Sequence, residues 1–413
     1  MKCIVSDDVV LSWPLEGPLA THIVEFAGWL QDEGYALYSR RKRILLAACF
    51  SRWLETERVN SIRVSSELMV RYLRSRGRGV VVFQRECMAL RQFIDFLRSR
   101  DVIPAERVLP RQPSPVEQAV QEYEFYLLNE RALAQVTVDN YAPFVREFLT
   151  SRFGREPVKL SQLCAGDIVG FVQCVAPRLH LKRAKLLTTA LRSFLHYARY
   201  RGDIQHDLAA AVPTVANWTM TSIPRAIPPD LVRRLLASID RHTAVGLRDY
   251  AILLLLARLG LRACEIAELE LEDIDWNGGS LCLQRKGGQR GTLPLPADVG
   301  TAIAAYLRHG RPRNCNSRRV FLTVRAPIRG FQNSVAISSL VQERLKRACI
   351  KAPTQGAHQF RHGLATDMLR HGASLTEIGE VLGHRSPETT KIYTKVDLDA
   401  LRPLALPWPG GMR

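Results

Sequence analysis

The sequence lacks the features that carry a chain into or across a membrane. Its longest apolar run, Ala251–Ala257, is far shorter than the ~20 residues that a membrane-spanning helix needs. Near the start, Asp7 and Asp8 interrupt the stretch where an export signal would have its apolar core. We therefore expect a cytoplasmic protein that has no membrane as a partner.

Paired cysteines and acidic side chains are scarce as well. The nine cysteines are odd in number and no two are spaced as C-x-x-C, which argues against a disulfide framework and a zinc knuckle. Asp and Glu number 40 against 58 Lys and Arg, so the formal net charge is +18 at pH 7. This excess attracts polyanions and predicts a nucleic-acid partner; a ribosome or an acidic membrane surface would also attract a basic protein.

Two proline-bearing stretches divide the 413 residues into segments. A chain of this length exceeds what one ordinary core accommodates, so more than one domain is expected. Proline interrupts helices, and we interpret Pro104–Pro115 and Pro213–Pro229 as linkers. The predicted domains are residues 1–107, 116–213 and 224–413.

The first two segments resemble each other. In both, apolar residues recur at i, i+3 and i+4, which predicts small helical bundles. Ala89–Ile103 near the end of the first and Ala190–Ile204 near the end of the second both begin Ala-Leu-Arg, with a Phe two residues later. Upstream, the matches are Trp29-Leu30 with Tyr126-Leu127 and Trp53-Leu54 with Phe148-Leu149. The first segment is therefore a candidate duplicate of the second.

The third segment combines helical and strand patterns. Helices are predicted over Pro229–Ser238, Leu247–Leu259, Ser334–Ala348, Arg361–His371, Ser374–Leu382 and Pro387–Tyr393. Ile274–Trp276, Leu281–Leu283 and Thr292–Leu295 flank glycine-containing turns, which predicts a small antiparallel sheet. We expect a mainly α, multidomain fold: helical bundles, then a mostly helical domain with one small antiparallel sheet.

Four pieces of the third segment collect polar groups suited to chemistry on a phosphate. They are Gly260-Leu261-Arg262-Ala263-Cys264-Glu265, Arg285-Lys286-Gly287-Gly288-Gln289-Arg290, His358-Gln359-Phe360-Arg361-His362, and Leu382-Gly383-His384 followed by Tyr393. In order and spacing they are similar to the pattern of the tyrosine recombinase (phage integrase) family. The resemblance covers residues 224–413 closely and the second segment loosely, as that family's helical, SAM-like core-binding domain. It implies the catalytic fold of tyrosine recombinases.

The resemblance also implies roles for the cations and the nucleophile. Tyr393 would attack a phosphodiester and form a 3′-phosphotyrosine. Arg262 and Arg361 would clamp the two non-bridging oxygens, because a guanidinium offers two parallel N–H donors. Lys286 would protonate the leaving 5′-oxygen.

Two histidines and a glutamate would complete the site. His358 is the candidate base, since a free phenol has a pKa of about 10 and needs help to lose its proton. His384 would donate a hydrogen bond to the phosphate. Glu265, one helical turn after Arg262, would orient active-site side chains.

Other interpretations of these residues stay open. Arg262 could cap a helix, and Lys286 could be a solvated hairpin lysine, with Arg285 or Arg290 as the alternative cation. The spacing of His358 and His362 suggests zinc, but no third ligand follows at a suitable distance in the sequence. His362 is expected to pack or hydrogen-bond near the site instead.

The implied function is site-specific DNA recombination for a mobile element, by integration, excision, resolution or transposition, without a metal, nucleotide or other cofactor. The expected partners are double-stranded DNA and further copies of the chain, with a dimer on each site and a tetrameric synapse. A partner recombinase is a further candidate, and the first segment would bind either DNA or protein. The alternatives are a type IB topoisomerase, a catalytically silent DNA-binding regulator and a basic RNA-binding scaffold, although no RNA-recognition motif is found.

Overall fold

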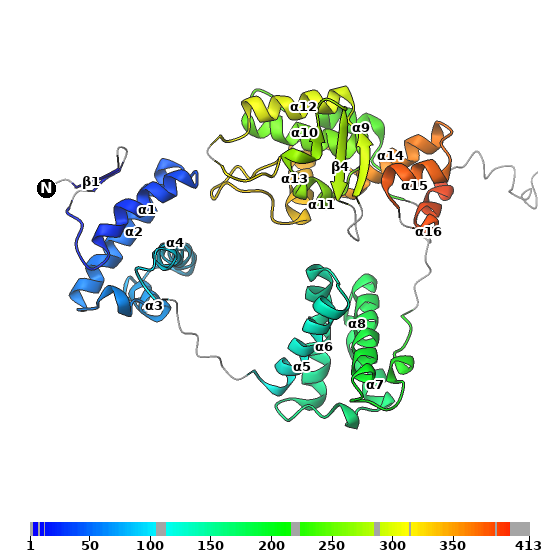
Figure 1. Ribbon diagram of the computed structural model, residues 1–413, viewed down its shortest axis with the longest axis horizontal. Coiled ribbons are helices and arrows are strands. Elements are labelled where there is room, and N and C mark those ends of the chain that lie inside the picture. The colour runs from blue at the N-terminus through cyan, green and yellow to red at the C-terminus, as the bar shows by residue number, and fades with distance from the viewer. Residues whose placement is uncertain are drawn as a thin grey trace, which may run out of the picture. The chain divides into compact units, whose positions relative to one another are not determined.

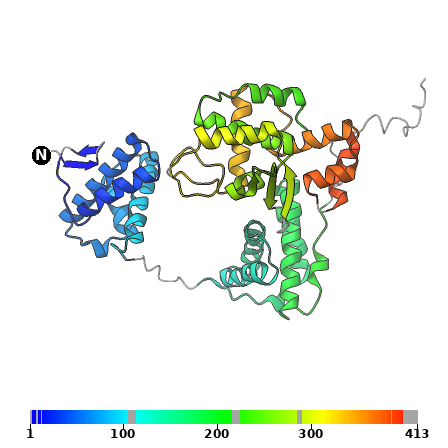
Figure 2. The same cartoon turned by 45° about the horizontal axis from the view of Figure 1, so that its top comes forward.

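A computed structural model describes residues 3–6, 9–11, 13–104, 113–215, 224–284, 290–313, 315–384 and 386–396. Figures 1 and 2 show its helices and strands from two directions. By their contacts, residues 1–106 and 222–413 group as one unit and residues 107–221 as another. A hydrophobic cluster forms within each predicted segment, and Ala326 of the third segment packs against the cluster of the first. The division into three domains and its boundaries stay a prediction.

The N-terminal bundle begins with a short antiparallel hairpin, β1 (Cys3–Ser6) and β2 (Val9–Leu11). Its helices are α1 (Ala20–Asp32), α2 (Leu37–Thr56), α3 (Ser66–Ser75) and α4 (Val80–Ser99). The hydroxyl of Ser65 accepts the N–H of Leu68 and so caps the start of α3. Apolar residues at helical spacing then bury one face of each helix in the shared core.

The second bundle also has four α-helices in succession, without a preceding hairpin among its described residues. Its helices are α5 (Pro115–Phe125), which continues as a π-helical turn over Tyr126–Glu130, α6 (Gln135–Phe153), α7 (Ala165–Val175) and α8 (Leu181–Tyr200). Ser114 caps α5 and Pro115 occupies its first turn, where the missing N–H costs nothing. Gly154, at φ 59°, ends α6.

The third segment is mostly helical around a central apolar helix. Its helices are α9 (Pro229–Ala237), α10 (Ala244–Leu259), α11 (Ala263–Glu268), α12 (Ala297–His309), α13 (Ser334–Arg347), α14 (His358–Arg370), α15 (Leu375–Leu382) and α16 (Pro387–Thr390), with a 3-10 helix over Lys391–Val396. Strands β3 (Ile274–Asp275), β4 (Ser280–Gln284) and β5 (Arg290–Pro294) form an antiparallel sheet in that order. The predicted fold class is confirmed.

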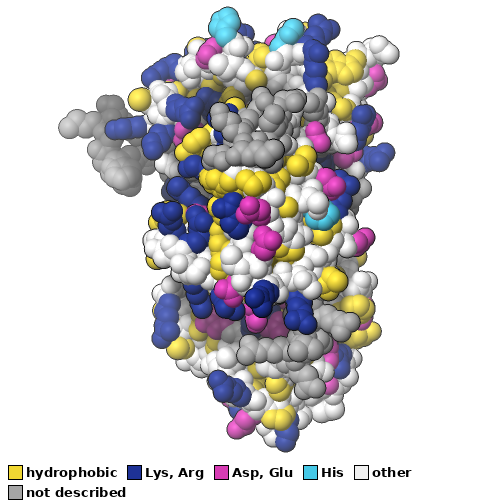
Figure 3. Space-filling view, turned by 90° about the vertical axis from the view of Figure 1, so that its left-hand side faces the viewer, with side chains coloured by type: hydrophobic (Ala, Val, Ile, Leu, Met, Phe, Trp, Pro, Cys, Tyr) yellow, Lys and Arg dark blue, Asp and Glu magenta, His cyan; other side chains and the backbone are white. Residues whose placement is uncertain are grey.

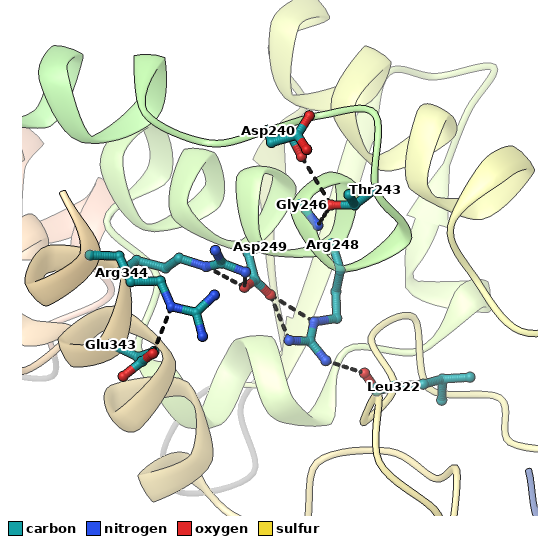
Figure 4. Close-up of polar contacts among 9 residues, drawn as sticks. Asp240, Thr243, Gly246, Arg248, Asp249, Leu322, Glu343 and Arg344 are labelled. Atoms are coloured by element: carbon teal, nitrogen blue, oxygen red, sulfur yellow. Dashed lines mark hydrogen bonds and ion pairs between the residues drawn. The ribbon is translucent and has the colours of Figure 1, made fainter. Parts of the chain in front are cut away.

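A buried ion cluster ties α10 to α13 (Figure 4). Asp249 accepts hydrogen bonds from Arg248 on one oxygen, at 2.8 Å from Nε, and from Arg344 on the other, at 2.6 Å from Nε. Arg248 also donates to the carbonyl of Leu322 at 2.9 Å. The Asp249 side chain is only 3% exposed, so both of its oxygens depend on these partners.

Within the described ranges, no helix is both long and apolar enough to pass through a membrane.

Candidate active site

The first arginine of the site follows a glycine that ends α10. Gly260 is left-handed, with φ 59° and ψ 29°, and a Cβ at this position would lie 2.9 Å from Leu364 and 3.0 Å from Leu382. Glycine therefore suits both the conformation and the space. The chain leaves this turn with Arg262 at the start of α11.

Glu265 holds Arg262 at two points. One carboxylate oxygen accepts the backbone N–H of Arg262 at 2.8 Å, and the other accepts its guanidinium at 2.7 Å. Glu265 is buried, while the Arg262 side chain stays 24% exposed. The expected orienting contact of Glu265 is therefore present, and the Arg262 side chain is still partly exposed.

The second arginine, Arg361, is buried in α14 and faces the same corner of the fold. Its guanidinium donates to the carbonyl of Gly260 at 2.9 Å and to the carbonyl of Leu382. Arg262 donates to the neighbouring carbonyl of Gly383 at 3.2 Å. The C-terminal end of α15 thus anchors both arginines, which are far apart in the sequence.

Tyr393 lies beside these groups and is 1% exposed. It belongs to the 3-10 helix after α16 and packs in a small apolar cluster with Ala365, Ile378 and Leu382. Its hydroxyl lies 3.0 Å from Nδ1 of His362. The predicted nucleophile is therefore enclosed and hydrogen-bonded in this structure.

The other two histidines flank this contact. His358 is exposed at the first position of α14, and its ring meets that of His362 edge-on, with centroids 4.5 Å apart. The ring of His384 lies parallel to that of Tyr393 at 6.4 Å between centroids, and its Nδ1 is 2.8 Å from the hydroxyl of Thr390. Thr390 was not singled out from the sequence, because a lone threonine before a tyrosine carries no signal.

Burial and positive charge shift the ionisation of these groups. Burial raises the pKa of Tyr393 to about 12, against the opposing effect of Arg361 and Arg262. Burial, helped by neighbouring positive charge, lowers the pKa values of His362 and His384 to about 4. At neutral pH the phenol therefore keeps its proton while both imidazoles are uncharged.

The structure brings together most of the predicted site. Arg262, Arg361, His384 and Tyr393 surround the end of α15, and His358 reaches Tyr393 through His362. Lys286 lies outside the described residues. Its flanking strands β4 and β5 are present as predicted, with Gln284 paired to Arg290, whose side chain is exposed.

His362 is the residue whose importance the sequence did not reveal. It was expected to pack or hydrogen-bond near the site, and it is the direct hydrogen-bond partner of Tyr393. The motif pointed to His358 as the base, but His358 and His362 lie one turn apart on α14, and spacing alone does not show which of them contacts the tyrosine. Among the described residues, no three potential ligands gather in a way that could hold a metal ion.

The chain is similar in sequence to known integrases and tyrosine recombinases. A model of the "Phage integrase family" matches residues 225–399. The chain is 56% identical over 410 residues to the "Putative integrase/recombinase y4rA" of Sinorhizobium fredii, covering 99% of both chains. It is 30% identical over 284 residues to the "Tyrosine recombinase XerD" of Listeria innocua, covering 67% of this chain and 93% of that protein.

Solved structures share the fold. The XerH site-specific recombinase, bound to a palindromic difH substrate after cleavage, matches with a TM-score of 0.58 at 18% identity, covering 73% of this chain and 98% of that one. A lambda integrase dimer bound to a COC′ core site matches with a TM-score of 0.51 at 16% identity, covering 74% and 86%.

Proposed function

Because this chain belongs to the phage integrase family of tyrosine recombinases, we propose that it cuts and rejoins DNA strands with Tyr393 as its nucleophile. The chain is a tyrosine-type recombinase enzyme. The assignment of Tyr393 rests on its surroundings. Its hydroxyl is 3.0 Å from Nδ1 of His362, and Arg361 and Arg262 lie close enough to lower its pKa.

The arginines supply the charge that the transition state needs. Attack on a phosphodiester develops negative charge on two non-bridging oxygens, and the planar guanidinium matches two such oxygens. Arg262 is partly exposed and fixed by Glu265, while Arg361 is buried and bonded to two carbonyls. Such fixed donors need little reorganisation when the charge appears, and the loss of one costs about 10²–10³ in rate.

The proton of Tyr393 must leave as its oxygen bonds to phosphorus. In the tautomer that carries its proton on Nε2, His362 accepts the phenol's hydrogen bond through Nδ1. The exposed His358 lies beside His362, and we propose that His358 is the base that finally accepts the proton. The pKa difference between the enclosed phenol and His362 opposes transfer, so we propose that DNA binding first opens the enclosure around Tyr393 while its hydroxyl stays within reach of His362.

The leaving group takes a proton in the same step. As the phosphorus–oxygen bond to the 5′-oxygen breaks, Lys286 would donate a proton to that oxygen. The 5′-hydroxyl of a partner strand can then attack the 3′-phosphotyrosine and release Tyr393. One phosphoester bond forms for each that breaks, so no nucleotide cofactor is needed.

The assembly on DNA and the biological role are proposed from similar proteins. The lambda integrase structure is a dimer on a core site, and y4rA is named an integrase/recombinase. We propose that this chain binds duplex DNA as a dimer on each site, joins two sites in a tetrameric synapse, and moves a mobile element. A partner recombinase would take the place of some copies in such a synapse.

A strand-transfer assay tests the proposed function. The substrate is a pair of duplexes carrying the sequences that flank the gene of this protein. Recombinant products should form with wild-type protein in the absence of nucleotides. If the protein instead relaxes any supercoiled plasmid and never joins the two duplexes, the topoisomerase alternative replaces the proposal.

A further inference from the structure

The two N-terminal bundles share their internal aromatic contacts. Three pairs of rings in the first bundle have counterparts at the same helical positions in the second, about a hundred residues later. With the distances between ring centroids, they are Phe26–Phe93 (4.8 Å) and Tyr123–Phe194 (5.3 Å), Phe26–Phe96 (5.4 Å) and Tyr123–Tyr197 (5.4 Å), Trp29–Phe96 (5.6 Å) and Tyr126–Tyr197 (4.7 Å). The same helices therefore meet through the same positions.

Smaller details of the two bundles agree as well. The contact between the second and third long helices is repeated, as Phe50–Tyr72 at 5.2 Å and Phe148–Phe171 at 5.2 Å. After the last helix, a left-handed residue follows in both: Asp101 at φ 54° and Gly202 at φ 81°. Agreement in ring packing at matching positions supports duplication more strongly than the shared Ala-Leu-Arg did, whereas a left-handed residue after a helix is common and adds little.

The bundles differ where their last long helix begins. In the second bundle, the start of α8 exposes Leu181, which corresponds to Val80, and then Lys182 and Arg183. In the first, the start of α4 has Val80, Val81 and Val82 exposed, with Val80 at 73%, and Met88 two turns later at 74%. Exposed apolar residues gathered at one place are typical of a binding surface.

Arginines surround these apolar side chains. Arg74, Arg78 and Arg85 are exposed, and none of their guanidinium groups has a hydrogen-bond or ion-pair partner in the part of the chain that the structure describes. An ion pair between Arg76 and Glu86 at 3.2 Å ties the end of α3 to the second turn of α4, so the arginines lie around one corner. On the molecular face in Figure 3, Lys and Arg side chains lie among apolar ones.

We propose that the N-terminal bundle is a duplicate of the second bundle that reads its own stretch of duplex DNA. The contact surface is the α3–α4 corner, defined as Arg74, Arg78, Val80, Val81, Val82, Arg85 and Met88. The identity of the partner rests on the proposed function, in which this chain binds duplex DNA. The N-terminal bundle then lengthens the bound site beyond that covered by residues 116–413.

The composition of the corner fits a major groove. Arginines neutralise phosphates or bind guanine edges, and apolar side chains contact thymine methyl groups. Valines stand where the second bundle has Lys182 and Arg183, so the two bundles present different chemistry to the bases. The N-terminal bundle should therefore prefer a different, thymine-containing sequence.

The salt dependence of binding tests the contact, with full-length protein on a labelled random-sequence duplex. Each lost phosphate contact lowers the slope of log affinity against log salt by about 0.9. Arg78→Gln and Arg85→Gln should each lower the slope by about this amount, and the double variant by about twice as much. The control is Arg100→Gln, which removes an exposed arginine after the other end of α4, ~30 Å away, and should leave the slope unchanged.

Selection of bound sequences from a random pool tests the reading of bases. Val81→Gln should lose the preference for thymine at one position of the site while the salt slope stays at the wild-type value. If the arginine variants keep the wild-type salt slope, the proposal is overturned. If they also bring two DNA sites together less well than wild type does, the corner is a protein-docking surface instead. A wild-type protein that forms no adduct on cleavable DNA would refute the proposed function separately.

Discussion

The hydroxyl of Tyr393 is hydrogen-bonded to Nδ1 of His362 at 3.0 Å, and the tyrosine is 1% exposed. This contact fixes the orientation of the phenol in the enclosed state. His362→Phe keeps a ring but removes the acceptor, and should slow cleavage by about 10²-fold, the lower range for loss of acid–base assistance. The measurement is the single-turnover rate of adduct formation at several pH values.

His362→Gln is the matched comparison for this prediction, because it retains a hydrogen-bond acceptor. It should recover part of the rate that His362→Phe loses, with DNA affinity unchanged in both. A wild-type rate and pH profile for His362→Phe would show that the contact has no part in the reaction.

Acid should destabilise the third segment through its buried histidines. The folded-state pKa values of His362 and His384 are lowered to about 4, below the ordinary 6.5. Between these pH values the two histidines bind protons in the unfolded chain but not in the folded one. The free energy of unfolding therefore falls as pH drops from 6.5 towards 4. Above pH 6.5 this contribution is fully present.

Thermal melting from neutral pH down to the folded-state pKa values measures the effect. His362→Phe should reduce the fall in melting temperature, whereas His371→Gln, which changes an exposed histidine just after the same helix, should not. An identical acid profile for wild type and His362→Phe would contradict the assigned cause.

Asp249 should be among the most sensitive structural positions. Asp249→Ala leaves the buried Arg248 and the mostly buried Arg344 without their carboxylate, and breaking a buried pair typically costs about 3–5 kcal/mol. Arg347→Ala on the same helix as Arg344 removes only an exposed pair with Glu343 and should cost less than about 1 kcal/mol. Denaturant unfolding of the two variants measures the difference, and equal losses would refute the structural role of the cluster.

Cleavage should not depend on a divalent metal. The positive charge that the phosphate needs comes from Arg262 and Arg361, which are held by Glu265 and by backbone carbonyls. Adduct formation should therefore persist in excess EDTA at the rate seen without it. Complete loss of activity that magnesium or zinc restores would overturn this account of the charge.

Local patterns in the sequence predicted much of the third segment. The predicted strands correspond to β3, β4 and β5, and the helix expected over Leu247–Leu259 begins three residues earlier, at Ala244. Helical periodicity and glycine-containing turns are local signals, so one sequence suffices to detect them. The hairpin of β1 and β2 was not foreseen, because strands of four and three residues carry too short an alternation.

The contacts within the site depended on tertiary structure. The motifs identified Arg262, Arg361, His384 and Tyr393, yet not that the two arginines donate to adjacent carbonyls at the end of α15. Nor could they show which histidine of α14 meets the tyrosine, since one helical turn brings both to the same face. Which histidine contacts Tyr393 depends on how the 3-10 helix after α16 packs against α14, and no local sequence pattern specifies that packing.

Identification of the residue that joins DNA tests the central claim most directly. A suicide duplex carrying the flanks of this protein's gene is incubated with wild-type protein, digested, and analysed by mass spectrometry for a peptide–nucleotide conjugate. The account predicts a 3′-phosphotyrosine at Tyr393, and a Tyr393→Phe variant that binds the duplex but forms no adduct. An adduct at another residue, or one that survives in Tyr393→Phe, would contradict it.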